Sequence, residues 1–359
     1  MNGRPDTNPP DKTETNLPGL NKGRGRFKKI VRNRFGHLRT VWRMLIYLGM
    51  VILAAAPLMG LLKVFSFILP AETGEDHIAS AINIVFMVGI DIALVLGAWI
   101  TLRWIDRRRF ALLGLSFSFK GVKELLAGFV FGFLYLTGVF LILWIAGFAD
   151  VTARGLDAQT LKGMLTYLVV FAAAGTLEEL ANRGYLFQVL IEGTRAWIAI
   201  LGSSLIFSLG HIFNQDFSWV SGLCLFLHGV LFGLAYLKTR SLWVPIGIHV
   251  AWNWAQGSVW GMKVSGTKIS DTLLESVPKG PEILSGGNFG VEGSLITVIV
   301  TVGLLLYIWK ARWIKPTQKM AALWRRYPSG FGLAPPEPEK TSEERLGESQ
   351  APFVTGEPD

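Results

Sequence analysis

Residues 124–148 read ELLAGFVFGFLYLTGVFLILWIAGF, and Glu124 carries the only formal charge in this run. An α-helix rises about 1.5 Å per residue, so a run of this length can cross the roughly 30 Å hydrocarbon core of a bilayer. Similar apolar runs recur along the chain and alternate with short charged loops. Of the 359 residues, 51% are hydrophobic and only 17% are charged, whereas globular chains are about a quarter charged. The sequence therefore predicts an all-α, polytopic membrane protein.

The apolar runs predict about eight transmembrane helices, which together form a membrane domain over residues 43–312. A longer connection, residues 263–292, is expected to be a loop on the outer side of the membrane. The predicted spans are 43–62, 80–102, 124–148, 161–191, 197–213, 219–237, 241–262 and 293–311.

The distribution of charge between these runs predicts their orientation. Residues 1–43 carry eleven Lys and Arg against three acids, and residues 103–123 carry six against one. The first outer loop instead holds Glu72, Glu75 and Asp76. Basic loops remain in the cytoplasm, and with eight spans every basic segment falls on the same side. Both termini are therefore expected in the cytoplasm, and we attribute the net charge of +9 to orientation and lipid contact, not to nucleic acid.

The two ends of the chain differ from the membrane domain in composition. Residues 1–42 are basic and rich in Asn, Pro and Gly, and are expected to be a largely disordered cytoplasmic segment. Residues 313–359 form a second cytoplasmic tail, predicted to be disordered and acidic from about residue 329. No cleavable signal peptide is recognised, so the first span is expected to be the insertion signal. These features fit a bacterial inner (plasma) membrane, or equally a eukaryotic internal membrane.

The fourth predicted span contains the charged stretch LEELANRGY, residues 177–185. Ionisable groups are costly inside a membrane and therefore indicate a site or a paired contact. Glu179 and Arg183 are four residues apart on one helical face, with the acid on the N-terminal side, which favours an ion pair. Glu178 lies about 100° around the helix from Glu179. Arg183 can thus neutralise one carboxylate and leave the other for chemistry, although a purely structural pair is the alternative.

Two later spans carry histidines at the same helical spacing. In FSLGHIFN, Phe207 and His211 are four residues apart, and in HVAWN, His249 and Asn253 are four residues apart. An imidazole and an amide on one face can both donate hydrogen bonds to a single oxygen atom. The alternatives are a hydrogen-bonded core histidine for His211 and a polar patch in an aromatic belt for the second pair.

The fourth and fifth spans are joined by the short segment EGTRAW, so we expect an antiparallel helical hairpin. The midpoint between positions 178 and 211 falls within this segment, which places Glu178 and His211 at the same depth. A carboxylate beside one imidazole and opposite an imidazole–amide pair suits activation of water and stabilisation of an oxyanion. Asp91, Lys63 and His228 have no evident partner in the sequence, and we interpret them as packing or anchoring residues.

The motifs EExxxR, FxxxH and HxxxN, in this order on successive apolar runs, resemble the CAAX prenyl protease type II and bacteriocin-processing (CPBP, or Abi) family of intramembrane proteases. The resemblance covers about residues 160–260 and implies an eight-helix fold and an endopeptidase of protein processing. It implies that Glu178 and His211 activate water, and that His249 and Asn253 form an oxyanion hole. The residues implied to support this site structurally are Glu179, Arg183 and Phe207.

The resemblance favours glutamate-dependent catalysis with no cofactor. If a metal is present, Glu178, His211 and His249 could be its zinc ligands. The expected partners are the lipid bilayer and a membrane-associated peptide or protein substrate. One alternative is a catalytically silent immunity or scaffold protein of the same fold. The other is a proton-coupled transporter that uses Asp91, Glu178 and His211 as a relay, although the repeated halves of many transporters are not evident in the sequence.

Overall fold

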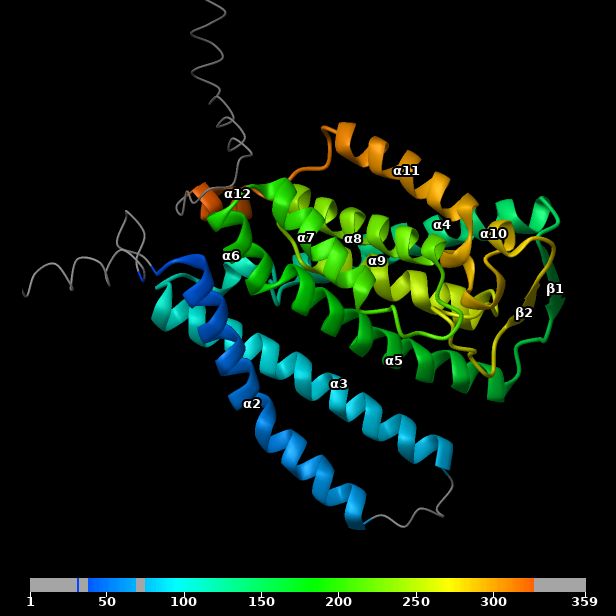
Figure 1. Ribbon diagram of the computed structural model, residues 1–359, viewed down its shortest axis with the longest axis horizontal. Helices are drawn as coiled ribbons and strands as arrows, with labels where there is room; N and C mark the ends of the chain where they lie inside the picture. Colours follow the sequence, from blue (N-terminus) through cyan, green and yellow to red (C-terminus); the bar gives the residue numbers. More distant parts are fainter. Residues whose placement is uncertain (1–30, 32–37, 69–74, 326–359) are drawn as a thin grey trace, which may run out of the picture.

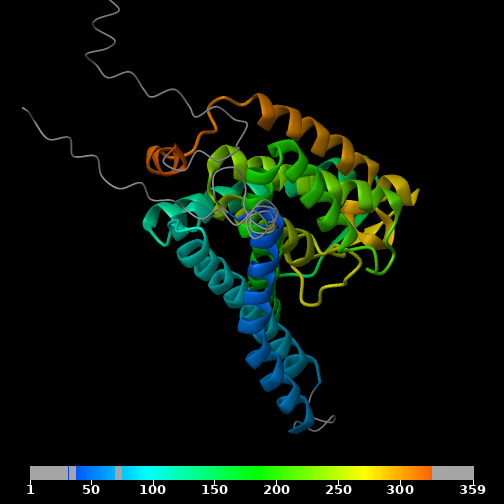
Figure 2. The ribbon, with the colours of Figure 1, turned by 60° about the vertical axis from the view of Figure 1, so that its left-hand side comes forward.

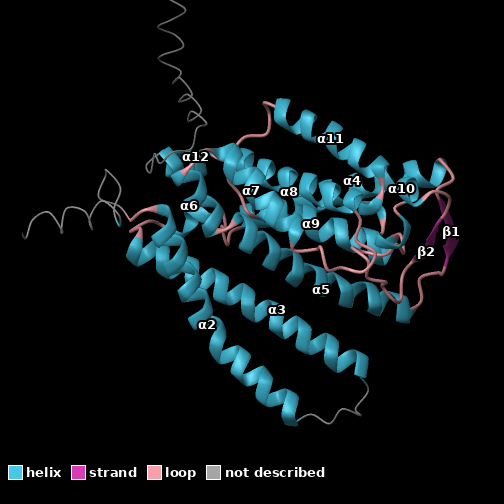
Figure 3. Ribbon diagram, in the orientation of Figure 1, coloured by secondary structure: helices cyan, strands magenta, loops and turns pink. Residues whose placement is uncertain are grey.

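The computed structural model describes residues 31, 38–68 and 75–325, and they form a helical bundle with a pair of strands at one end (Figures 1 and 3). The predicted disordered N-terminal segment and the acidic tail from about residue 329 lie almost entirely outside these ranges. The elements are α2 (Thr40–Ile68), α3 (Glu75–Ile100), η1 (Thr101–Ile105), η2 (Phe110–Leu113), α4 (Phe119–Ile145), β1 (Ala149–Ala153), α5 (Ala158–Arg183), α6 (Tyr185–Gly193), α7 (Ala196–Leu209), α8 (Trp219–Thr239), α9 (Trp243–Trp254), η3 (Ala255–Val259), β2 (Leu274–Pro278), α10 (Glu282–Ser285), η4 (Gly287–Phe289), η5 (Val291–Gly293), α11 (Leu295–Lys310) and α12 (Gln318–Arg325).

A helix lies at each of the eight predicted spans. The length and apolar character of several of these helices support an integral membrane protein. Within the described ranges, five helical segments are long and apolar enough to cross a membrane: Thr40–Leu61, Ile84–Ile105, Phe119–Ile145, Ala158–Gly193 and Trp219–Thr239. The apolar helices α7 and α11 are shorter. Helix α9 has only 12 residues before the π-helical turn η3 continues it. The predicted count of eight full spans is therefore not confirmed.

The predicted span over residues 161–191 lies within one apolar helical segment, which is interrupted at Gly184, where the chain divides into α5 and α6. Gly184 has φ −74° and ψ −137°, which is outside the helical region. A Cβ atom at this position would overlap the carbonyl oxygen of Leu180, so the break requires glycine. Beyond the break, α6 packs against α2. The break therefore separates the helix with the paired glutamates from the helix that contacts the first hairpin.

The prediction of an all-α fold is also incomplete, because β1 pairs with β2 in antiparallel register, with Val151 opposite Ser276. The predicted outer loop 263–292 contains β2, α10, η4 and η5, and we refer to residues 261–294 as the cap. The cap packs against α8 and α11 through η5, at the end of the bundle opposite α6 and α12 (Figure 1). Strands separated by about 120 residues cannot be paired from local sequence patterns, which is why this sheet was missed.

Helix α9 is the centre of the bundle, packed against α4, α5 and α8. Its closest neighbour is α4, on which Gly128 and Gly132 lie directly against the backbone of Val244 and Ile248. Small residues allow such close helix contact, which is typical of membrane bundles. In contrast, the α2–α3 hairpin extends away from the other helices at its loop end (Figure 2). The candidate site residues on α9 thus lie in the closely packed centre of the bundle.

Candidate active site

Arg183 is the structural centre of the site, and the predicted ion pair is confirmed. Its Nη1 lies 3.1 Å from Oε1 of Glu179, and both side chains are fully buried. Its Nη2 donates to the carbonyl oxygen of Gly229 on α8 at 2.9 Å. The guanidinium carbon lies 4.9 Å and 5.4 Å from the ring centroids of Phe207 and Phe232, as in cation–π contacts. One charged group therefore connects α5, α7 and α8.

Glu179 has a second partner that the sequence did not indicate. Nδ1 of His249 lies 3.1 Å from the same Oε1 that contacts Arg183. An ionised carboxylate only accepts hydrogen bonds, so Nδ1 of His249 must carry the hydrogen. Phe232 stacks on the face of this imidazole, with 5.1 Å between ring centroids and 16° between planes. The carboxylate and the phenyl ring together fix the orientation of His249.

His211 does not lie on a helix as predicted, because α7 ends at Leu209 and the chain turns there. Its contact with Phe207 is nevertheless present, since Nδ1 lies 2.8 Å from the Phe207 carbonyl oxygen. A carbonyl oxygen accepts only, so Nδ1 is the protonated nitrogen in the neutral ring and Nε2 keeps its lone pair. Nε2 lies 3.7 Å from Oε2 of Glu178, which confirms the predicted proximity of these two residues.

Both histidines approach the same oxygen atom. Nε2 of His249 lies 4.0 Å from Oε2 of Glu178, the oxygen that His211 also faces. This oxygen is buried and has no hydrogen-bond partner in the described chain, whereas 30% of the Glu178 side chain is exposed. Separations of this size are too long for direct hydrogen bonds, but one water about 2.8 Å from two of these atoms can bridge them.

Asn253 is half-buried on α9, four residues after His249 and about 6 Å further along the helix axis. Among the described residues, none forms a hydrogen bond with its side-chain amide. The predicted face with one imidazole and one amide is therefore present, because α9 is helical across both positions.

The arrangement of motifs agrees with a comparison with known families. Residues 160–255 match the family described as Type II CAAX prenyl endopeptidase Rce1-like. This match supports the CAAX protease family for the segment that carries the motifs. The matched segment contains every candidate residue from Glu178 to Asn253. No curated protein and no solved structure matches the chain significantly. The match supports a function of the intramembrane protease type and a membrane-associated peptide or protein as substrate.

Two contributors to the site region were not identified from the sequence. Phe232 contacts both Arg183 and His249, but a phenylalanine in an apolar run gives no distinguishing signal. Glu292 is a buried carboxylate in the cap, only 1% exposed. The sequence offered one indication of Glu292, its position directly before the last apolar run. A single acidic residue at such a position can be buried when its loop folds back against the protein.

The remaining ionisable residues have separate surroundings. Nε2 of His228 lies 3.1 Å from the hydroxyl of Tyr135, so its interpretation as a hydrogen-bonded packing residue is confirmed. Asp91 on α3 has one buried oxygen without a hydrogen-bond partner in the described chain. The side chain of Lys63 lies outside the described residues. No group of three or more His, Cys, Asp and Glu side chains that could hold a metal ion occurs among the described residues. Catalysis without a metal therefore stays a prediction.

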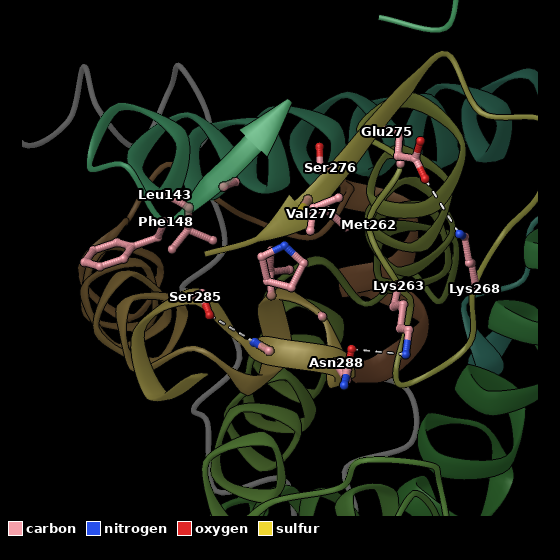
Figure 4. A pocket seen from close by; sticks show the side chains of 16 residues that line it. Leu143, Phe148, Met262, Lys263, Lys268, Glu275, Ser276, Val277, Ser285 and Asn288 are labelled. Atoms are coloured by element: carbon pink, nitrogen blue, oxygen red, sulfur yellow. Dashed lines mark hydrogen bonds and ion pairs between the residues drawn. The ribbon is translucent and has the colours of Figure 1, made fainter. Parts of the chain in front are cut away.

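A cavity of about 170 Å³ lies apart from these residues, between the cap and the end of α4. Leu143, Phe148, Met262 and Val277 contribute apolar surface to its lining. Figure 4 shows that Lys268 at its edge points to Glu275, and that Lys263 points to Asn288. None of the candidate active-site residues lines this cavity, so it is separate from the candidate active site.

Proposed function

We propose that this protein is an intramembrane endopeptidase of protein processing, in which Glu178 and His211 activate the water that hydrolyses a peptide bond. The observation that carries the proposal is the approach of two imidazole Nε2 atoms to one buried oxygen of Glu178, at 3.7 and 4.0 Å. A carboxylate and a neutral imidazole with a free lone pair are both proton acceptors. Such a pair is suited to receive the proton of a water held between them.

The reaction follows from these positions. The water oxygen forms a bond to the carbonyl carbon of the substrate, while its proton passes to the Glu178–His211 pair. The carbonyl electron pair moves onto oxygen and gives a tetrahedral oxyanion. When this intermediate collapses, the carbon–nitrogen bond breaks and the stored proton is delivered to the leaving amine. The proposed steps use no metal or other cofactor.

We assign stabilisation of the oxyanion to His249 and Asn253. Because Nδ1 of His249 already donates to Glu179, its Nε2 can donate only when the ring is an imidazolium. The charges of the cluster favour this form, since two carboxylates face the single guanidinium of Arg183. A positive His249 balances the remaining negative charge, and the Asn253 amide adds a neutral donor. Glu179 thus has two functions, as the partner of Arg183 and as the counter-ion of His249.

We place the enzyme in a bacterial inner membrane with both termini in the cytoplasm. The charge difference between the basic segments and the first outer loop supports this orientation. The substrate is then a peptide or protein that is itself associated with the membrane.

The proposal is tested with protein reconstituted in lipid vesicles and an internally quenched peptide that ends in a farnesylated Cys-aliphatic-aliphatic-X sequence. The same peptide without the farnesyl group measures the contribution of the lipid. We expect Glu178→Ala and His211→Ala to lower turnover by about 10²–10⁴-fold. Glu275→Gln, which changes a half-buried carboxylate of the cap away from the candidate site, is the matched control and should leave turnover unchanged.

A comparison in cells addresses substrates beyond this peptide. Membrane peptides are profiled in cells with wild-type protein and in cells with Glu178→Ala. Peptides that are present with the wild-type protein and absent with Glu178→Ala support the proposed endopeptidase activity. Identical profiles, together with no cleavage in vitro, contradict the proposal and favour a silent scaffold, whereas a Glu178-dependent proton flux favours a transporter.

A further inference from the structure

Glu292 is a buried carboxylate with three donors around it. Gln256 donates from Nε2 to Oε2 at 2.6 Å. Trp252 donates from Nε1 to Oε1 at 3.3 Å, and the Ser265 hydroxyl donates to Oε1 at 3.4 Å. Burial raises the pKa of Glu292, and the hydrogen bonds from Gln256 and Trp252 oppose that effect. The donors therefore stabilise a group that would otherwise be poorly suited to the protein interior.

The chemistry of the three neighbours favours a carboxylate over an amide. An ionised carboxylate accepts hydrogen bonds at both oxygens, whereas a glutamine presents one oxygen and one NH₂ group. A glutamine at position 292 would direct its NH₂ group at either Gln256 or the Trp252–Ser265 pair. Gln256 on one side, and Trp252 and Ser265 on the other, already donate hydrogen bonds to the side chain at position 292, so the NH₂ group would face another donor. Glu292→Gln is thus nearly equal in shape but wrong in hydrogen bonding.

The first two donors connect Glu292 to the part of α9 that carries the amide of the site. Trp252 directly precedes Asn253, and Gln256 lies in the π-helical turn η3 that follows. Gln256 also donates to the carbonyl oxygen of Lys263 in the cap at 2.7 Å. A π-helical turn departs from regular α-helical hydrogen bonding, so side-chain anchors of this kind help to set its position. The cap thereby holds the end of α9 at Asn253.

The third donor connects Glu292 to the turn that carries His211. The backbone carbonyl of Ser265 accepts a hydrogen bond from Nδ2 of Asn214 at 3.1 Å. The backbone N–H of Asn214 in turn donates to the carbonyl oxygen of His211 at 3.0 Å. Lys263 adds an ion pair to Asp216 at 3.7 Å. His211 lies beyond the end of α7 and is bonded to the last turn of that helix through Phe207 and Ser208. The contacts with the cap hold the other side of its turn, at Asn214 and Asp216.

We propose that Glu292 is a positioning residue of this site, which fixes the cap between α9 and the His211 turn. It thereby sets the positions of His211 and Asn253 relative to Glu178. Its effect on the rate rests on the proposed function, whereas its effect on the His211 turn does not. The two effects are therefore measured separately.

Mobility of the turn is measured with a spin label. The protein has one cysteine, Cys224, which is fully buried, and Phe213 in the turn is 96% exposed. A nitroxide on Phe213→Cys therefore reports the motion of the turn in reconstituted vesicles with little background. We expect narrower, more mobile spectra when Glu292→Gln is added. Glu275→Gln alters a half-buried carboxylate of the cap that pairs with Arg154 and Lys268, and should leave the spectrum unchanged.

A second variant keeps the test decisive if Glu292→Gln does not fold. Asn214→Ala removes the contact with Ser265 from the side of the turn and leaves no buried charge unpaired. It should also narrow the spectrum. The reference is the spectrum of the labelled Phe213→Cys protein without a further change. If the folded protein with Asn214→Ala or with Glu292→Gln gives the same spectrum as this reference, the proposal is overturned.

The values of kcat and KM distinguish a positioning role of Glu292 from a role in folding alone. With the internally quenched peptide, Glu292→Gln should lower kcat on the order of 10²-fold, as expected for displaced catalytic groups, with KM unchanged. Glu275→Gln should retain the wild-type kcat. If wild type cleaves the peptide and folded Glu292→Gln cleaves it equally fast, the positioning role is wrong and the proposed function stands. If wild type does not cleave the peptide and the membrane-peptide profiles in cells are also identical, the proposed function fails, and the spin label still decides whether Glu292 holds the turn.

Discussion

Arg183→Ala is expected to destabilise the protein by about 3–5 kcal/mol, because it leaves the buried charge of Glu179 without its guanidinium partner. The variant also loses the hydrogen bond to Gly229 and the contacts with two aromatic rings. His249 remains 3.1 Å from Glu179 and offsets part of the charge, so we expect the lower half of this range. Since about 1.4 kcal/mol is a factor of ten, the folding equilibrium should shift by at least about 10²-fold.

The measurement is unfolding of the purified protein in mixed micelles, with the free energy compared between variants. Arg154→Ala is the matched control, because Arg154 also pairs with a glutamate, Glu275, but 51% and 33% of these two side chains are exposed. An exposed pair contributes about 0–1 kcal/mol. The difference between the two arginine variants should therefore be at least about 2 kcal/mol.

A double variant tests whether the unpaired charge is the cause. Arg183→Met combined with Glu179→Gln removes both charges and keeps most of the volume, so it should regain much of the lost stability. It should not regain activity, because His249 would lose its carboxylate partner. Equal destabilisation by Arg183→Ala and Arg154→Ala, or no recovery in the double variant, would refute this account.

Three further predictions concern chemistry and topology. Asn253→Ala should lower turnover by about 10²–10³-fold with KM and abundance nearly unchanged, because one oxyanion donor is lost. Asn253→Asp should be slower still, since a carboxylate repels the developing negative charge, and wild-type rates for Asn253→Asp would contradict the assignment. Prolonged chelation should leave peptide cleavage unchanged, whereas loss of cleavage that stoichiometric zinc restores would make Glu178, His211 and His249 metal ligands. Reporters fused to the two termini should both report the cytoplasm, and opposite locations would contradict the predicted orientation.

The local part of the site was predictable from the sequence because helical geometry is local. The four-residue spacing of Glu179 and Arg183 predicts a contact between them, which the 3.1 Å ion pair confirms. The short connection between the fourth and fifth predicted spans placed Glu178 beside His211, and they lie 3.7 Å apart. Hydrophobic runs likewise predicted the positions of the helices, although they did not predict the break at Gly184.

Contacts between distant segments were decided only by the tertiary structure. His249 lies 70 residues after Glu179 and reaches the same oxygen as Arg183 because α9 packs against α5. Glu292 meets Trp252 and Gln256 because the cap folds back against η3. The sequence by itself determined the mainly helical, membrane-spanning class of fold and predicted the candidate residues of the site, since apolar length and helical period act over a few turns of one helix. The partners of Glu179, the turn at His211 and the place of Glu292 depend on how separate helices pack, and that information is not local.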